Sequence, residues 1–292
     1  MNTKAALLTD RTVLQITGED RVSFLQGLVT NDVEKIPEDE ARFAGLLTPQ
    51  GKILFDFFIV PGEESFLLDC PAAVSAGLAK RLTFYKLRAK VAVADVSSRW
   101  RVAAAWGEGA ADWAKVHATV AYPDPRLPAL GFRMLLSETD APQFPANLDD
   151  YETMRITLAV PEGGKDYAYG DAFPHDACFD LLHGVSFKKG CFIGQEVVSR
   201  MQHRGTARTR VLAVSAKQNL PCGGADILTD GLAIGRLGSA AGGRGVALAR
   251  AGRVRDALAK GQSFSAGGIP VDLAAPAWAT YTLDAELAGA AH

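Results

Sequence analysis

The residue whose surroundings best suit chemistry is Cys191, in the segment Lys188-Lys189-Gly190-Cys191-Phe192-Ile193-Gly194-Gln195-Glu196. Two lysines and a glycine precede it, and the apolar spacing after it predicts a helix over residues 192–202. Cationic neighbours and the amides at a helix start stabilise a thiolate over a thiol. The pattern indicates a reactive cysteine, and the alternative is a small buried apolar residue.

A partner base for Cys191 is not evident from the spacing. No His, Asn or Asp lies beside it, although His175, His183 and His203 are available elsewhere in the chain. Each of these is better explained as a surface or hydrogen-bonded structural residue. A protease-type triad is therefore not indicated, while a base distant in the sequence stays open.

The stretch from residue 188 to residue 210 is strongly basic. It contains one acid, Glu196, and six cations, namely Lys188, Lys189, Arg200, Arg204, Arg208 and Arg210. Such a stretch could receive a polyglutamate tail, a phosphate or an RNA backbone. A solvated helix face is the alternative.

Three carboxylates, Asp56, Asp176 and Glu196, could bind the amino-pyrimidinone edge of a pterin-like ring, because a carboxylate accepts two parallel hydrogen bonds from adjacent N–H groups. Exposed or salt-bridged acids are the alternative. Phosphate-loop, dinucleotide, zincin and α/β-hydrolase motifs are absent from the sequence. The nucleotide-dependent and hydrolase classes are therefore disfavoured.

The elements that must position these residues follow an α+β layout. Helices are predicted to start near residues 21, 71, 110, 149 and 192, and strands to cover 12–17, 41–47, 53–60, 66–69, 90–96, 100–106 and 132–136. Pro49 and Gly51 predict a hairpin turn, and residues 141–146 a linker. After residue 210, short β runs punctuated by glycines predict a small terminal barrel.

Length and composition favour a cytoplasmic protein of two or three domains. The chain has 292 residues, 48% of them hydrophobic, and no apolar run of signal-peptide or membrane-helix length. Four scattered cysteines form no C-x-x-C pair, so we expect neither a disulfide framework nor a bound metal. The net charge of −2 argues against direct nucleic-acid binding and against a membrane partner, except at a local basic patch.

Four segments of the sequence resemble the motifs of a known protein family. The run Lys189-Gly190-Cys191-Phe192-Ile193-Gly194-Gln195-Glu196 resembles the K-G-C-[YF]-x-G-Q-E signature of the YgfZ-type folate-binding proteins, relatives of the glycine-cleavage aminomethyltransferase (T-protein). Three further segments match in the family's order, namely residues 18–32, 49–56 and 155–176. The resemblance covers residues 13 to 210, and the terminal barrel agrees by pattern.

The resemblance implies an α+β, three-domain aminomethyltransferase-like cloverleaf with a C-terminal small β-barrel. The domains would be a discontinuous folate-binding core of residues 1–45 and 147–205, a ferredoxin-like α+β domain of residues 46–146, and a barrel of residues 206–292. The cofactor would be tetrahydrofolate or a derivative, and Cys191 would be the catalytic residue. The implied folate contacts are Asp56, Arg155, Asp176, Lys189, Gln195, Glu196 and Arg200.

Three departures from the relatives bear on the activity. Phe55-Asp56 replaces the Asp-Asp pair of the aminomethyltransferases, so one of the two acids is missing. Asp176 stands where the relatives usually have Glu, and Phe192 replaces the commoner Tyr. The missing acid disfavours aminomethyl transfer.

The favoured function is an accessory protein that uses tetrahydrofolate and Cys191 to assemble or repair iron–sulfur enzymes, tRNA-modifying ones among them. Its partners would be folate and iron–sulfur client proteins. A folate-dependent aminomethyltransferase of the glycine-cleavage type is one alternative, and it would make the protein an enzyme. An RNA-binding module is the other, although the sequence lacks an aromatic stacking motif of the RRM kind.

Overall fold

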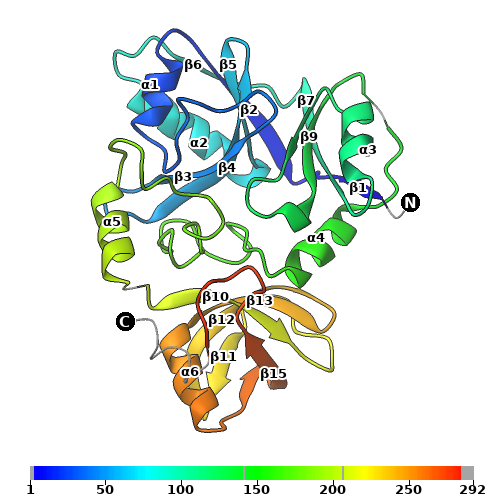
Figure 1. Ribbon diagram of the computed structural model, residues 1–292, viewed down its shortest axis with the longest axis vertical. Coiled ribbons are helices and arrows are strands. Elements are labelled where there is room, and N and C mark those ends of the chain that lie inside the picture. The colour runs from blue at the N-terminus through cyan, green and yellow to red at the C-terminus, as the bar shows by residue number, and fades with distance from the viewer. Residues whose placement is uncertain (1–2, 141, 206, 284–292) are drawn as a thin grey trace. The chain divides into compact units, whose positions relative to one another are not determined.

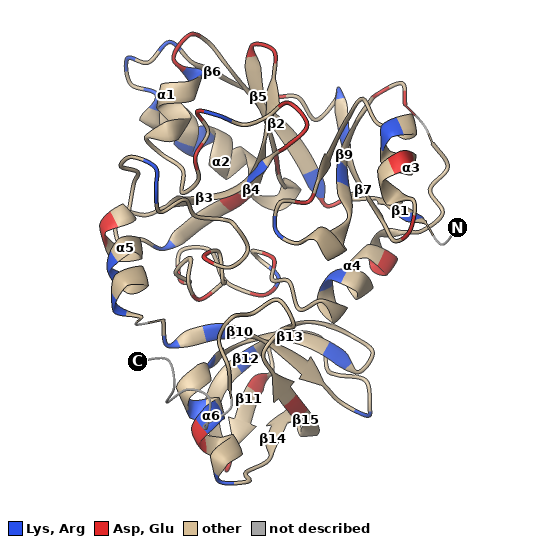
Figure 2. Ribbon diagram, viewed as in Figure 1, with Lys and Arg blue, Asp and Glu red and all other residues tan. Residues whose placement is uncertain are grey.

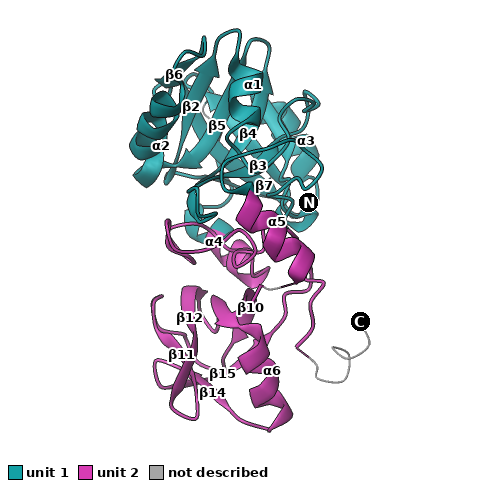
Figure 3. Cartoon of the chain, turned by 90° about the vertical axis from the view of Figure 1, so that its left-hand side faces the viewer, with its two compact units in different colours: residues 1–151, 182–195 teal, residues 152–181, 196–292 magenta. Residues whose placement is uncertain are grey.

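The computed structural model of the chain describes residues 3–140, 142–205 and 207–283. The chain forms two compact units, coloured separately in Figure 3. Unit 1 contains residues 1–151 and 182–195, and unit 2 contains residues 152–181 and 196–292. None of the helices within the described ranges has the length and apolar character that crossing a membrane requires.

The larger sheet of unit 1 has five antiparallel strands in the order β3-β4-β5-β2-β6 (Figure 1). Their bounds are Arg42–Leu47, Ile53–Gly62, Ser65–Pro71, Arg11–Thr17 and Ala92–Asp95 in that order. The helices of this part are α1 (Arg21–Gln26) and α2 (Ala72–Tyr85), and Leu78 and Leu82 of α2 are fully buried in the core. The predicted hairpin at residues 48–52 joins β3 to β4, and Gly51 supplies its positive φ of 81°.

The second sheet of unit 1 has the order β1-β7-β9-β8. Its strands are Lys4–Leu7, Trp100–Trp106, Phe132–Ser137 and Val120–Pro123, and helix α3 (Ala110–His117) packs on it through Ala110 and Ala114. The strands β1 and β2 precede residue 46 but pair with strands that follow it, Lys4 opposite Trp106 and Arg11 opposite Pro71. This pairing joins residues 1–45 to residues 46–146, and the predicted three-domain division stays a prediction.

Unit 2 ends in a closed barrel of the order β10-β13-β12-β11-β14-β15, which confirms the predicted terminal barrel. Its strands are Thr209–Ser215, Arg244–Arg250, Leu232–Ala241, Asp226–Thr229, Phe264–Ala266 and Ile269–Ala274, with helix α6 (Ala251–Ala259) beside them. Leu212, Ile227 and Phe264 lie in its apolar core. Residues 161–173 form no helix or strand, as predicted.

Several boundaries differ from the prediction. Helix α4 (Leu148–Thr157) begins where expected, but α5 (Gln195–Arg204) begins three residues later than predicted. The strands β1 and β8, the helix α6 and the 3-10 turn η1 (Pro128–Leu130) were not predicted. Residue 141 of the predicted linker lies outside the described residues, and Ala146 donates its N–H to Ala5 across 3.0 Å.

Candidate functional site

Cys191 lies at the surface of unit 1, in a loop that is anchored on both sides. The cysteine and Gly190 are exposed, while the residues that flank them, Lys189 and Phe192, are 8% and 7% exposed. Ile193 packs against the core of the five-stranded sheet. The loop therefore presents a thiol to solvent while its neighbours are fixed in the interior.

The first anchor is the ammonium of Lys189, which donates to three backbone carbonyls at the end of α1. Its Nζ lies 2.8 Å from the oxygen of Gln26, 2.7 Å from that of Val29 and 2.9 Å from that of Asn31. The ammonium also lies 5.4 Å from the centre of the Phe192 ring. Burial lowers the pKa of Lys189 to about 8, against the opposing attraction of the Asp32 and Glu34 carboxylates.

The second anchor is Gly194, which closes against the β3–β4 hairpin. Its φ of +80° lies in the left-handed region, and a Cβ at this position would lie 2.6 Å from the carbonyl oxygen of Thr48. A side chain is therefore excluded for two independent reasons. Gly190 differs, because no described atom would lie within 4 Å of its Cβ.

The same loop is bound to the segment that follows α1. The Thr30 hydroxyl donates to the carbonyl of Gly184 over 2.6 Å and accepts from the N–H of Gly45 over 2.8 Å. The Asn31 amide donates to the carbonyls of Phe43 and His183 over 2.8 and 2.6 Å. Three of the matching sequence segments, around residues 30, 50 and 190, therefore meet in one part of unit 1.

The observed loop corrects the interpretation of Cys191 as a helix-start residue. Helix α5 begins at Gln195, because the positive φ of Gly194 breaks the helical path before it. Cys191 therefore lies in the loop before α5 and not at the start of that helix. The ammonium of Lys189 is directed to carbonyl groups, so Lys188 is the exposed cation next to the cysteine in the sequence.

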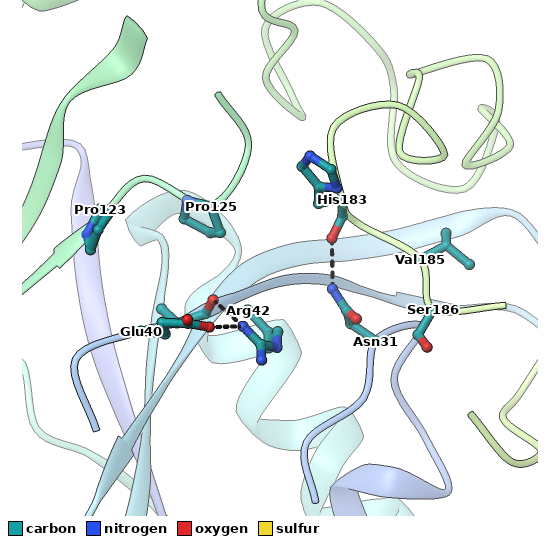
Figure 4. Close-up of a pocket in the computed structure, with 9 residues that line it drawn as sticks. Asn31, Glu40, Arg42, Pro123, Pro125, His183, Val185 and Ser186 are labelled. Atoms are coloured by element: carbon teal, nitrogen blue, oxygen red, sulfur yellow. Dashed lines mark hydrogen bonds and ion pairs between the residues drawn. The ribbon is translucent and has the colours of Figure 1, made fainter. Parts of the chain in front are cut away.

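A cavity of about 510 Å³ lies in unit 1 beside the hydrogen bonds that join residues 30–31 to residues 183–184 (Figure 4). Its walls are Asn31, Glu40, Ala41, Arg42, Pro123, Pro125, His183, Val185 and Ser186. Glu40 and Arg42 form an ion pair of 2.6 Å, and His183 has a left-handed φ of 56° that is uncommon outside glycine. Asn31 connects the cavity to the Cys191 loop. Its side-chain amide donates to the carbonyl of His183, which also lines the cavity, and its backbone carbonyl accepts from the ammonium of Lys189.

Arg155, predicted to contact folate, is itself fully buried and lies in a charge network of unit 2. Its guanidinium donates to the carboxylates of Asp166 at 2.6 Å and Glu152 at 2.8 Å, and to the hydroxyl of Ser239 at 2.8 Å. The side chains of Arg155 and Asp166 are both 0% exposed. These carboxylates raise the pKa of Arg155 although burial alone lowers it. The network gives Arg155 a structural role.

Two more cations of the basic stretch have acidic partners. Arg200 pairs with Glu196 at 2.6 Å along the exposed side of α5, where Figure 2 shows acid and base in neighbouring turns. Arg210 pairs with Asp180 at 2.9 Å and donates to the carbonyl of His175. Together with Lys189, three of the six cations of the basic stretch therefore have partners within the protein. Lys188, Arg204 and Arg208 remain exposed.

The other predicted folate contacts lie in both units. In unit 1, Asp56 is buried on β4 and Gln195 is half-buried at the start of α5. In unit 2, Asp176 accepts the N–H of Phe173 over 3.0 Å, which closes a turn. Folate binding by these residues stays a prediction. His175, considered as a base, contacts Gln202 across 3.0 Å, and His203 lies exposed on α5.

The four cysteines divide into two buried and two exposed thiols. Burial raises the pKa of Cys70 to about 12 and also raises that of Cys178, so both are inert. Cys191 and Cys222 are exposed. Within the described part of the chain, no group of three or more His, Cys, Asp or Glu side chains is placed to hold a metal ion.

The two sheets of unit 1 and the closed barrel of unit 2 define the aminomethyltransferase fold. The solved glycine cleavage system aminomethyltransferase T from Bartonella henselae has this fold, with a TM-score of 0.74 over 93% of this chain and 84% of that one. The two sequences are 15% identical, so the likeness concerns the fold alone. The predicted fold class is confirmed.

The sequence comparisons are more specific. Residues 208–281 match the family model "CAF17, C-terminal beta-barrel domain". The human protein "Iron-sulfur cluster assembly factor IBA57, mitochondrial" is 32% identical over 280 residues, 86% of this chain and 78% of its own length, and the mouse protein is 31% identical over the same shares. The chain belongs to the IBA57 family.

Two fungal members are longer than the region they share with this chain. The Neurospora crassa homolog is 33% identical over 227 residues, 70% of this chain, and the Mycosarcoma maydis homolog is 33% identical over 230 residues. The chain spans 52% and 57% of their lengths, which is about half of each. All four relatives are named as mitochondrial proteins, so the expectation of a cytoplasmic protein is corrected.

Proposed function

We propose that this chain is an iron–sulfur cluster assembly factor in which the Cys191 thiolate contacts the cluster. The observation that carries the proposal is an exposed thiol in a loop whose flanking residues, Lys189 and Phe192, are buried. The relatives named as iron–sulfur cluster assembly factors support it. By resemblance to the YgfZ-type proteins, the clients would be iron–sulfur enzymes, tRNA-modifying ones among them.

The chemistry of this site is ligand exchange. A cysteine thiolate is the usual protein ligand of iron in these clusters. When Cys191 enters, an Fe–Sγ bond forms, the bond from iron to another thiolate breaks, and the leaving thiolate takes the proton of Cys191. The irons keep their oxidation states, so no oxidant or reductant is consumed.

The remaining ligands would come from a second molecule. The described residues contain no group of His, Cys and acidic side chains that could complete a cluster site. A cluster at Cys191 would therefore be shared with a partner protein or a small thiol. An incomplete ligand set on this chain favours transfer over storage, because each exchange then breaks fewer bonds to it.

We infer that tetrahydrofolate or a derivative is the second ligand of the protein, as in the YgfZ-type proteins. Lys189, one of the six cations predicted to receive a glutamate tail, is engaged with three carbonyls, and Arg155, predicted to contact folate, is engaged with carboxylates. Calorimetric titration of the full chain with reduced folate tests the inference, and an absence of heat would remove it.

A cluster-uptake experiment tests the role of the thiol. The full chain is mixed anaerobically with a [2Fe–2S] cluster held by glutathione, and cluster on the reisolated protein is measured by visible absorbance and circular dichroism. Cys191→Ser is expected to lose the chiral signal. Cys222→Ser removes the other exposed cysteine and is expected to keep it. Equal uptake by Cys191→Ser and the wild type would refute the proposal.

A further inference from the structure

The C-terminal end of α2 exposes two large apolar side chains. Phe84, in the last turn of the helix, is 69% exposed, and Leu87, two residues after its end, is 87% exposed. We call residues 80–88 the α2 tip. Within unit 1 these side chains face away from the core, which α2 contacts through Leu78 and Leu82.

The α2 tip also lies in a segment whose charges are all positive. Residues 70–94 contain five Lys and Arg residues and no Asp or Glu. Lys90 pairs with Glu19 at 2.7 Å. The other four, Lys80, Arg81, Lys86 and Arg88, have no ion pair with any residue of the described ranges, and Arg81 lies over the ring of Tyr85 at 5.9 Å.

The backbone at Leu87 does not require a leucine. Leu87 has a φ of 45°, the left-handed conformation that ends many helices and in which glycine is preferred. A β-carbon is unfavourable there, and an exposed leucine side chain gains nothing from burial. Burial inside unit 1 does not offset the unfavourable backbone conformation, since the side chain is 87% exposed.

We propose that the α2 tip binds an anionic lipid surface. Phe84 and Leu87 enter the boundary between headgroups and acyl chains, and the four unpaired cations lie at the headgroups. The charge complementarity is local. It departs from the expectation based on the net charge of −2, because that value averages the tip with acidic segments elsewhere.

The arrangement of the apolar side chains selects lipid over the other polyanionic partners. Phe84 and Leu87 are largely exposed, and a lipid interface accepts protruding side chains without a complementary pocket. A nucleic acid would use Phe84 as a stacking platform but would leave Leu87 in water. Lysines are depleted from protein interfaces, whereas Lys and Arg clusters beside apolar residues are typical of anionic membrane contacts.

Vesicle flotation with the full chain tests the proposal. The vesicles are phosphatidylcholine alone, or equal parts phosphatidylcholine and phosphatidylglycerol, at low and at high salt. Binding is expected only to the anionic vesicles, and high salt weakens it. Each cation near such a surface strengthens binding about fivefold, so Lys86→Glu with Arg88→Glu lowers it by at least about thirtyfold. Phe84→Ser with Leu87→Ser lowers it about tenfold or more.

Matched variants elsewhere on the surface distinguish binding at the α2 tip from nonspecific adsorption to the vesicles. Val116→Ser changes an equally exposed apolar residue on α3, and Arg253→Glu with Lys260→Glu changes exposed cations on or next to α6. Both are expected to bind vesicles as the wild type does. No binding to anionic vesicles, equal binding to neutral ones, or binding that survives both α2-tip variants overturns the proposal. Binding of tRNA without binding of vesicles also overturns it.

Discussion

The loop around Cys191 in unit 1 and the Arg155 network in unit 2 each bury a cation of a family motif, but they differ in what they leave exposed. In the loop, the buried Lys189 is turned inward and an exposed thiol is left at the surface. In the network, Arg155, Asp166 and Ser239 bond with one another. The comparison teaches that a cation in a family motif is often scaffold, and that the group left exposed is the candidate for chemistry.

Removing the centre of the network tests its structural role and is expected to have the largest effect. Arg155→Met leaves the Asp166 carboxylate buried without its cation, which costs about 3–5 kcal/mol of unfolding free energy. Urea unfolding measures the loss. Lys165→Met removes a partly exposed neighbour of Glu152 and is expected to cost about 1 kcal/mol or less. An Arg155→Met midpoint equal to that of the wild type would contradict the assignment.

The two glycines of the loop give a matched pair. Gly194→Ala places a β-carbon against Thr48 at a positive φ and is expected to cost about 2–4 kcal/mol. Gly190→Ala meets no neighbouring atom and is expected to change stability by less than about 0.5 kcal/mol. Thermal unfolding of both variants measures the difference. Equal melting temperatures would show that the hairpin does not fix the loop.

Lys189 makes the stability of the loop depend on pH, which the Arg155 network does not predict. Lys189→Met leaves three carbonyls without a donor and is expected to cost about 2–3 kcal/mol. The folded pKa of about 8 lies below the ordinary 10.5, so the unfolded chain binds more protons between these values. The stability advantage of the wild type over Lys189→Met therefore grows as pH rises through this window. An advantage that shrinks there would contradict the buried ammonium.

Leu87 gives the smallest expected effect, with the opposite sign. Leu87→Gly removes an unfavourable left-handed leucine and is expected to stabilise unit 1 by about 0.5 kcal/mol, the gain being limited by the chain entropy of glycine. Leu87→Ala keeps the β-carbon and is expected to bring no gain. Denaturant unfolding compares the three proteins. A clear loss in Leu87→Gly would mean that the side chain supports the fold.

Local patterns predicted most of the fold. Pro49 and Gly51 located the β3–β4 turn, and the glycine rhythm located the barrel. The strand β1 was missed because its pairing is set by β7, about a hundred residues away. The helix α6 was missed because it has only nine residues and lies among glycine-rich strands, although Val254 and Ala257 are buried on one side of it.

The site was predicted less completely for the same physical reason. The exposed thiol could be singled out from its motif, but burial of Lys189 depends on the end of α1 coming close to it, about 160 residues away in the sequence. The cavity residues Glu40, Arg42 and Ser186 carried no signal beyond their polarity. Asn31 did carry one, since it stands in a segment that matches the family.

Rescue of iron–sulfur enzyme activity in a strain that lacks this gene tests the central claim most directly. Cys191→Ser and Cys222→Ser are expressed at equal levels, and the activity of a radical methylthiotransferase is measured. The exposed position of Cys191 predicts an unfolding free energy within about 0.5 kcal/mol of the wild type. The account predicts no rescue by Cys191→Ser and full rescue by Cys222→Ser. Full rescue by the stable Cys191→Ser protein would contradict it.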